Sequence, residues 1–194
     1  MTKHRCGWCV GDPLYEAYHD QEWGVPVYDD QTIFEFLILE TFQAGLSWIT
    51  ILRKRENFRE ALDDFDYKKI ACYSEAKLEA LLQNPGIIRN KLKVKATVSN
   101  AQAFIKIQEE FGSFSKYIWS FVNHKPIQNS VKIYKEAPAT TAISDALSKD
   151  LKKRGFKFTG STVVYAHMQA TGMVNDHEVG CFRYAEVKSL GIKP

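Results

Sequence analysis

Cysteine and long apolar stretches are scarce in this sequence. Its 194 residues contain 4 cysteines, too few for a small secreted domain held together by disulfides, and this usage fits a reducing compartment. The most hydrophobic run, residues 33–39, contains Glu35 and is followed by Glu40, so it is too short and too charged to cross a membrane. Residues 1–30 mix charges and lack the apolar core of a signal peptide. We therefore expect a soluble, cytoplasmic monomer with no membrane partner.

An excess of one charge is also missing, because the formal net charge is only +3. That balance does not by itself indicate a nucleic-acid partner, but basic residues are concentrated in segments 53–55, 89–95 and 152–157. One such segment is commonly a solvated helix face, whereas three together favour a phosphate-bearing partner. The sequence has no internal repeat, glycine-rich nucleotide loop or nucleophile elbow. Its 45% hydrophobic content is enough for a core, most simply that of one domain spanning residues 1–194.

The alternation of apolar and polar residues that is typical of strands is absent, and we expect an all-α fold. Helix start signals are clear at Asp12-Pro13, where the aspartate can cap the helix and the proline can occupy its first position. The expected helices cover residues 12–24, 30–45, 74–84, 89–111, 144–154 and 161–171. Residues 125–141 are polar and contain proline, and we interpret them as a long connection.

Candidate metal ligands occur at both ends of the chain. Zinc favours thiolate and imidazole in a tetrahedral shell, and a shell filled by protein is structural rather than catalytic. One zinc would therefore fasten together segments about 160 residues apart. The main candidates are Cys6, His19, His177 and Cys181. Cys9 and His4 could also serve, or the cysteines could be buried without a metal. Cys72 is expected in the core.

Glu40 falls in the apolar stripe of the helix predicted for residues 30–45. Its carboxylate should therefore point into the interior or into a cleft, because the apolar neighbours three, four and seven residues away are Leu37, Phe36 and Ile33, with Ala44 on the same stripe. A buried carboxylate is costly unless it is paired, so Glu40 either has an internal arginine or tyrosine partner or binds a ligand with hydrogen-bond donors. Trp48, Tyr15 and Tyr18 are expected nearby. Such a site suits a flat, polar, cationic ring such as a nucleobase.

Residues 84–88 are expected to form a tight hairpin between two helices. Gly86 and Ile87 would present backbone N–H groups at the start of the second helix, with Arg89 and Lys91 directly behind them. Such an arrangement can bind a phosphate group without reading sequence. On its own the signal is weak, because glycine-containing turns are common between helices. Leu46 is expected on a separate turn, before Trp48.

The residues as a set resemble the bacterial 3-methyladenine DNA glycosylase I family over nearly the whole chain. The matching motifs are residues 6–8 (CGW), 12–15 (DPLY), 18–20 (YHD), 22–24 (EWG), 43–48 (QAGLSW), 86–89 (GIIR), 119–124 (WSFVNH), 152–158 (KKRGFKF) and 174–177 (VNDH). The resemblance implies an all-helical helix-hairpin-helix fold whose N- and C-terminal segments are clasped by one structural zinc. It also implies the ligand set Cys6, His19, His177 and Cys181, which leaves Cys9 outside the family's pattern.

The resemblance further implies a base-excision repair enzyme that acts on alkylated double-stranded DNA. It would flip 3-methyladenine out of the duplex, hydrolyse the N-glycosidic bond and leave an abasic site. No lysine is identifiable as a Schiff-base nucleophile, so we expect no lyase activity. Glu40 would be the catalytic, base-recognising carboxylate, with Tyr15, Tyr18 and Trp48 binding the base. Leu46 would fill the gap left by the base, and the DNA backbone would contact Gly86, Ile87, Arg89 and Lys91. The rival interpretations are a non-catalytic DNA-binding module and a zinc hydrolase with an open coordination position.

Overall fold

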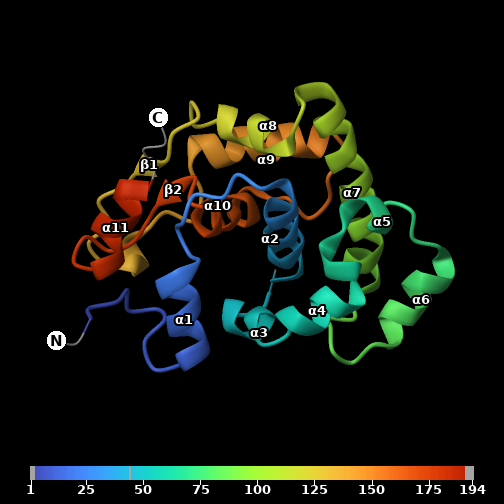
Figure 1. Cartoon of the computed structure of the whole chain (residues 1–194), viewed down its shortest axis with the longest axis horizontal. Coiled ribbons are helices and arrows are strands. Elements are labelled where there is room, and N and C mark those ends of the chain that lie inside the picture. Colours follow the sequence, from blue (N-terminus) through green and yellow to red (C-terminus); the bar gives the residue numbers. More distant parts are fainter. Residues whose placement is uncertain (1–2, 44, 191–194) are drawn as a thin grey trace.

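The structure, a computed structural model, describes residues 3–43 and 45–190 and is mostly helical, as the sequence predicted (Figure 1). In chain order its elements are α1 (Pro13–Gln21), α2 (Asp30–Gln43), α3 (Trp48–Leu52), α4 (Arg55–Ala61), η1 (Asp63–Phe65), α5 (Tyr67–Ile70), α6 (Glu75–Gln83), α7 (Lys91–Phe111), α8 (Phe114–Ser120), β1 (Ile127–Gln128), η2 (Tyr134–Glu136), α9 (Ala142–Lys153), α10 (Ser161–Ala170), β2 (Val174–Asn175) and α11 (Phe182–Leu190).

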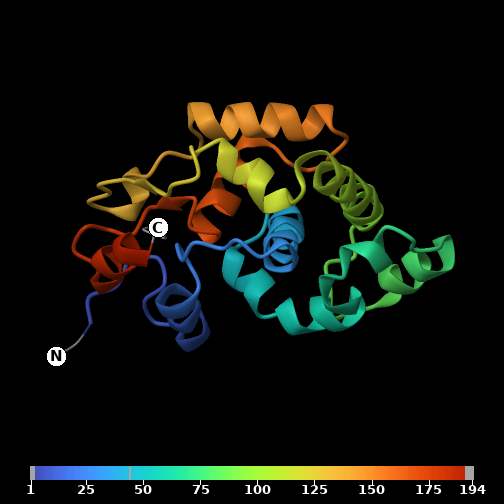
Figure 2. The same cartoon turned by 45° about the horizontal axis from the view of Figure 1, so that its top comes forward.

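The central helix of the fold is α2. Its residues 33–42 are all buried, and it contacts α3, α7, α8 and α10. In Figures 1 and 2 it lies in the middle of the molecule with helices around it. A helix covered on all sides can hold charged side chains only where they are paired or face a cavity. Both glutamates of α2, Glu35 and Glu40, therefore need an explanation.

Local capping signals explain where several helices begin and end. The Asp12 carboxylate accepts hydrogen bonds from two backbone N–H groups in the first turn of α1, and Asn90 does the same for α7. The Ser74 hydroxyl caps α6, and α7 ends at Gly112, which has a left-handed φ of 83°. A side-chain cap of this kind stabilises a helix by about 1 kcal/mol. These signals are local in sequence, so the sequence alone places these helix ends within a few residues.

The connection between α6 and α7 is the hairpin that the sequence predicted. The backbone N–H of Gly86 donates to Asn84 Oδ1 at 2.8 Å. A Cβ at position 86 would lie 2.9 Å from that oxygen and 3.1 Å from Asn57, so a larger residue would have to displace these side chains and the turn favours glycine. From the neighbouring α3–α4 junction, the Lys54 ammonium donates to the carbonyl oxygens of Pro85 and Gly86, each at 3.2 Å.

The N-terminal segment of the described chain lies close to α11, the last helix (Figures 1 and 2). The backbone N–H of Phe182, at the start of α11, donates to the carbonyl of His4 at 3.0 Å. The strands β1 and β2 pair in parallel nearby and attach the 125–141 connection to the segment before α11. Each strand has only two residues, too few for any alternation to appear in the sequence, which is why no strand was expected. Ala44 lies outside the described residues.

None of the helices in the described part of the chain is both long enough and apolar enough to cross a bilayer.

Candidate active site and metal centre

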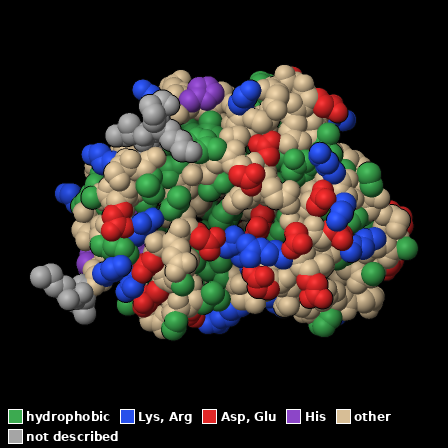
Figure 3. Space-filling view, viewed as in Figure 1, with side chains coloured by type: hydrophobic (Ala, Val, Ile, Leu, Met, Phe, Trp, Pro, Cys, Tyr) green, Lys and Arg blue, Asp and Glu red, His purple; other side chains and the backbone are tan. Residues whose placement is uncertain are grey.

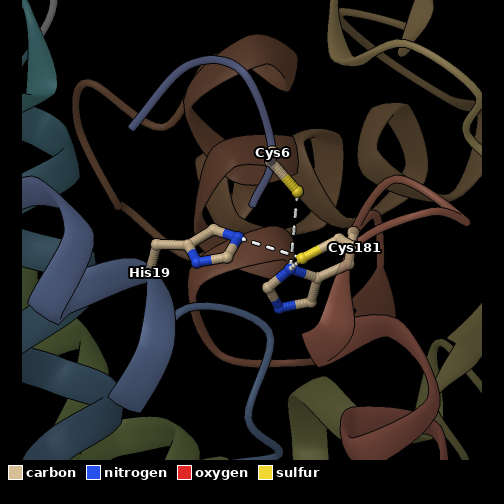
Figure 4. A group of neighbouring side chains, drawn as sticks. Cys6, His19 and Cys181 are labelled. Atoms are coloured by element: carbon tan, nitrogen blue, oxygen red, sulfur yellow. Dashed lines mark hydrogen bonds between the residues drawn. The ribbon is translucent and has the colours of Figure 1, made fainter. Parts of the chain in front are cut away.

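Four ligand side chains from the two ends of the chain meet beside α1. They are buried, their ligand atoms lie within 4.8 Å of one another, and they are the predicted Cys6, His19, His177 and Cys181. The Cys181 Sγ atom lies 3.5 Å from His19 Nε2 and 3.8 Å from His177 Nδ1. The Cys6 Sγ atom lies 3.6 Å from His177 Nδ1. Figure 4 shows Cys6, His19 and Cys181 converging on one point from separate segments. This cluster could hold one metal ion.

The outer ring nitrogens of both histidines are engaged by other residues. His19 Nδ1 lies 2.8 Å from Asp20 Oδ1, and His177 Nε2 lies 3.0 Å from the carbonyl oxygen of Trp23. Carboxylate and carbonyl oxygens only accept hydrogen bonds, so these outer nitrogens carry the ring protons. The inner nitrogens therefore turn their lone pairs toward the two thiols. Histidines that ligate metals are commonly held in this way.

The remaining cysteines lie outside this cluster. Cys9 is buried, but its thiol donates to the carbonyl of Cys6 at 3.2 Å and does not face the four ligand atoms. His4, the other alternative ligand, is exposed. Cys72 is also exposed, because it lies in a turn after α5 rather than on a packed helix face, so its expected place in the core is wrong.

A pocket of about 140 Å³ opens next to the cluster. The structure brings Tyr15 and Tyr18 from α1, Glu40 from α2 and Trp48 from the start of α3 together in its wall, as the sequence predicted. The other lining residues are Trp8, Trp23, Gln43, Tyr134, Ala166 and Gln169. Aromatic side chains therefore dominate the wall, and Glu40 is its acidic group.

The two buried glutamates of α2 have opposite environments. Glu35 accepts a hydrogen bond from Arg55 at 2.6 Å and also pairs with Arg59. Glu40 is 4% exposed, and no hydrogen bond or ion pair to its carboxylate is found among the described residues. Burial raises the pKa of Glu40 from its ordinary value of 4.5 to about 8. The internal arginine thus pairs with Glu35, and the Glu40 carboxylate remains available for a ligand.

Hydrogen-bond donors in the pocket wall are also without partners. The indole N–H groups of Trp8 and Trp48 are buried and have no acceptor among the residues that the structure describes. The Trp8 ring lies 4.7 Å from that of Tyr15, and the Tyr18 ring lies 5.7 Å from that of Trp48. Burial raises the pKa of Tyr15 to about 12 and that of Tyr18 well above its ordinary value, so both phenols stay neutral. Buried polar groups are rarely left unpaired, and their concentration in one pocket points to a ligand.

Part of the pocket wall comes from the 125–141 connection, where sequence reasoning found no site. The Tyr134 ring lies 5.9 Å from Trp8 and 6.0 Å from Trp23. The backbone N–H of Tyr134 donates to Glu178 Oε1 at 2.9 Å. Glu178 directly follows the metal-ligand candidate His177 in the sequence. This loop has no periodic pattern, so the sequence carried no signal for Tyr134. Trp8 was closer to detection, because it follows Cys6 by two residues.

Comparisons with known proteins decide the family. Residues 8–184 match the methyladenine glycosylase family. The chain belongs to that family. It is 52% identical over 180 residues to DNA-3-methyladenine glycosylase 1 of Escherichia coli (strain K12), a match covering 93% of this chain and 96% of that protein.

Solved structures of methyladenine glycosylases agree with this assignment. A crystal structure of 3-methyladenine DNA glycosylase I superposes with a TM-score of 0.90 at 51% identity, covering 92% of this chain and 98% of the other. A variant of such an enzyme in complex with 3-methyladenine superposes with a TM-score of 0.89 at 38% identity, covering 92% and 96%.

The residues assigned to DNA contact by the methyladenine glycosylase resemblance lie on two turns. Leu46 is 37% exposed on the turn between α2 and α3. Arg89 and Lys91 are exposed at the α6–α7 hairpin. Ile87 is only 3% exposed and its side chain packs in the core, while the N–H of Gly86 is taken by Asn84. The side chains of Arg89 and Lys91 are therefore more accessible to DNA than the Ile87 side chain or the Gly86 N–H.

The basic segments of this methyladenine glycosylase are not uniform phosphate-binding patches. Arg55 is 8% exposed and paired inside the molecule, and Lys93 is buried. Arg154 forms ion pairs with Glu110 and Asp150, both at 2.6 Å. In Figure 3 basic side chains are interspersed with acidic ones across the visible face. Three-dimensional pairing therefore removes several of the cations that the sequence pattern suggested for phosphate binding.

Proposed function

We propose that this chain is a base-excision repair glycosylase that hydrolyses the N-glycosidic bond of 3-methyladenine in alkylated duplex DNA. Its E. coli relative carries the name DNA-3-methyladenine glycosylase 1, and a related structure holds 3-methyladenine. The observation that carries the proposal is the unpaired, buried Glu40 carboxylate within an aromatic pocket.

The pocket chemistry matches a methylated adenine. Methylation at N3 gives the base in DNA a positive charge, which favours a carboxylate and the faces of aromatic rings. The exocyclic amine of adenine can donate to Glu40, and the phenols and indoles of the wall can stack on the ring or bond its edge. Unmodified adenine has no positive charge to offset the cost of ionising Glu40 in this site. Recognition by Glu40, Tyr15, Tyr18 and Trp48 would therefore favour the damaged base.

The reaction requires little proton transfer to the leaving group. When the bond between the sugar and the cationic base breaks, its electron pair moves onto the base, which leaves as a neutral molecule. The sugar is left with oxocarbenium character, and addition of water with loss of a proton gives the abasic site. Extrusion and orientation of the nucleotide then provide most of the catalysis. We assign Glu40 to recognising the base and stabilising the charge of the bound nucleotide.

We expect no lyase activity. A glycosylase that also cleaves the strand through a Schiff base needs a lysine amine at the reacting carbon. Within the described residues, the pocket wall contains no lysine. Water is therefore the acceptor of the sugar, and the product is an intact strand with an abasic site.

We further propose that the metal is one structural zinc. Two thiols and two imidazoles are the donor set that zinc favours, and tetrahedral zinc places sulfur and nitrogen ligands about 3.5 Å apart. Three of the four sulfur–nitrogen separations in the cluster are 3.5, 3.6 and 3.8 Å. A bound zinc would have a shell filled by protein. Cys6 and His19 would then be joined to His177 and Cys181, holding the two ends of the chain together.

Duplex DNA would approach the side that carries the two turns. Leu46 would occupy the space vacated by the flipped nucleotide, as apolar wedges do in other DNA complexes. Gly86 and Ile87 would contribute the hairpin backbone, and Arg89 and Lys91 would hold phosphates. We expect the chain to do this as a monomer.

Release of free base tests the proposal. Duplex DNA carrying labelled 3-methyladenine is incubated with the parent protein or with Glu40→Ala, and the released base is identified by chromatography. We expect release by the parent and a loss of at least about a hundredfold in the variant, because the only acidic group of the described pocket wall is gone. Circular dichroism checks that the variant is folded. No release by a folded, metal-loaded parent would favour a non-catalytic DNA-binding module.

A further inference from the structure

A buried lysine joins α7, the helix that follows the hairpin, to the C-terminal end of α2, the helix that carries Glu40. Lys93 lies in the first turn of α7 and is 7% exposed, whereas its neighbour Leu92 is 69% exposed. Its ammonium donates to the backbone carbonyl of Phe42, in the last turn of α2, at 3.0 Å. The sequence suggested a phosphate contact for this residue, but its side chain points inward.

The Phe42 carbonyl lies, along the chain, between two residues to which we assign roles in the reaction. Glu40 is two residues before Phe42, and Leu46 is four residues after it, on the turn that begins where α2 ends. The last carbonyl groups of a helix accept no hydrogen bond from within the helix. A donor from elsewhere in the protein can therefore fix the conformation of the helix end. The Lys93 ammonium also lies at the negative end of the helix dipole, where a cation is favoured.

Packing alone does not account for a charge at this position. Burial lowers the pKa of Lys93, which reflects the cost of removing its ammonium from water. A methionine would fill a similar volume without that cost. The charged lysine instead donates a directional hydrogen bond to the Phe42 carbonyl, which ties the end of α2 to the first turn of α7.

We propose that Lys93 is a positioning residue for base extrusion: it holds the end of α2 so that Leu46 enters the duplex in register with the hairpin's grip on the phosphates. This inference rests on the proposed glycosylase function. It assigns Lys93 no contact with DNA or with the base. Substitution of Lys93 should therefore slow base release from duplex DNA, and this effect should depend on the presence of the Leu46 side chain.

The test compares Lys93→Met with Lys106→Met, which removes the same charge from an exposed site on the same helix. We expect Lys93→Met to bind free 3-methyladenine within about twofold of the parent and to lower single-turnover base release from duplex DNA about tenfold or more, since a small misplacement of a positioned group has effects of this size. Lys106→Met should match the parent in both measurements. Lys93→Arg, which keeps a charged donor, should recover most of the rate and serves if Lys93→Met fails to fold.

A double-mutant cycle separates positioning from general loss of structure. If Lys93 acts through Leu46, the double variant Lys93→Met/Leu46→Ala should release base no more slowly than Leu46→Ala alone. Additive losses, an unchanged rate in Lys93→Met, or weakened binding of the free base would each overturn the proposal. Base release by the parent is the separate check on the glycosylase function itself, so the two ideas can fail independently.

Discussion

Glu35 and Glu40 show how one buried helix can hold two carboxylates for different purposes. The charge of Glu35 is neutralised by Arg55 and Arg59, which join α2 to α4. The Glu40 carboxylate has no such partner within the described structure. Burial raises the pKa of this carboxyl group, because its charged form is poorly solvated there. A paired carboxylate stabilises the fold relative to a broken pair, whereas an unpaired one destabilises it until a ligand arrives.

The cost of Glu40 should be visible in the pH dependence of stability. Its folded-state pKa of about 8 lies above the ordinary value of 4.5, so the native state binds this proton more tightly than the unfolded state. The cost is absent at low pH and grows as pH rises from 4.5 toward 8. We expect Glu40→Gln to raise the free energy of unfolding by roughly 3 to 5 kcal/mol at about pH 9 and far less at about pH 5.

Urea unfolding at the two pH values checks this expectation, with Glu35→Gln as the matched control on the same helix. That control breaks a buried ion pair and should lower stability by about 3 kcal/mol at both pH values. A Glu40→Gln variant that is less stable than the parent at about pH 9 would show that Glu40 has a stabilising partner in the free protein.

At the scale of elements, the sequence was informative where the cause of a structure is local. The caps at Asp12, Ser74 and Asn90 lie next to the helices they start, and Glu40 stands out within its own helical stripe. Tyr134 and Lys93 could not be assigned in this way, because their positions depend on contacts with segments far away in the chain. The sequence therefore predicted the part of the pocket wall formed by α1, α2 and the start of α3. The part contributed by the 125–141 connection was missed.

We expect the proposed metal clasp to support the pocket as well as the chain ends. Trp8 lies two residues after the metal-ligand candidate Cys6. The backbone N–H of Tyr134 donates to Glu178, which directly follows the metal-ligand candidate His177. We expect Cys181→Ser to lose zinc, to lower the melting temperature by about 10 °C and to weaken binding of free 3-methyladenine. Metal analysis, thermal unfolding and a binding titration check this. Cys9→Ser, which alters a buried thiol outside the cluster, should keep one zinc per chain; loss of the metal in that variant would mean that the ligand set is wrong.

For the whole molecule, the distribution of charge matters more than the net charge of +3. Arg89 is exposed at the hairpin, whereas Arg154 is held by Glu110 and Asp150. We expect Arg89→Gln to weaken binding of undamaged duplex DNA and to reduce the salt dependence of log K by about one phosphate contact. Arg154→Gln should leave that slope unchanged, although it removes the same charge. Equal slopes for both variants would contradict the assigned DNA-facing side. The extent of the single domain over residues 1–194 and the monomeric state stay predictions.

The most direct test of the whole account is a comparison of bases within one duplex. Single-turnover release is measured from strands carrying either 3-methyladenine or unmodified adenine at the same position, and the DNA product is examined before and after alkaline treatment. We expect free 3-methyladenine, little or no adenine, and a strand that breaks only after alkali, as an abasic site does. Equal release of both bases, or a strand broken without alkali, would contradict the assigned recognition by Glu40 and the monofunctional mechanism.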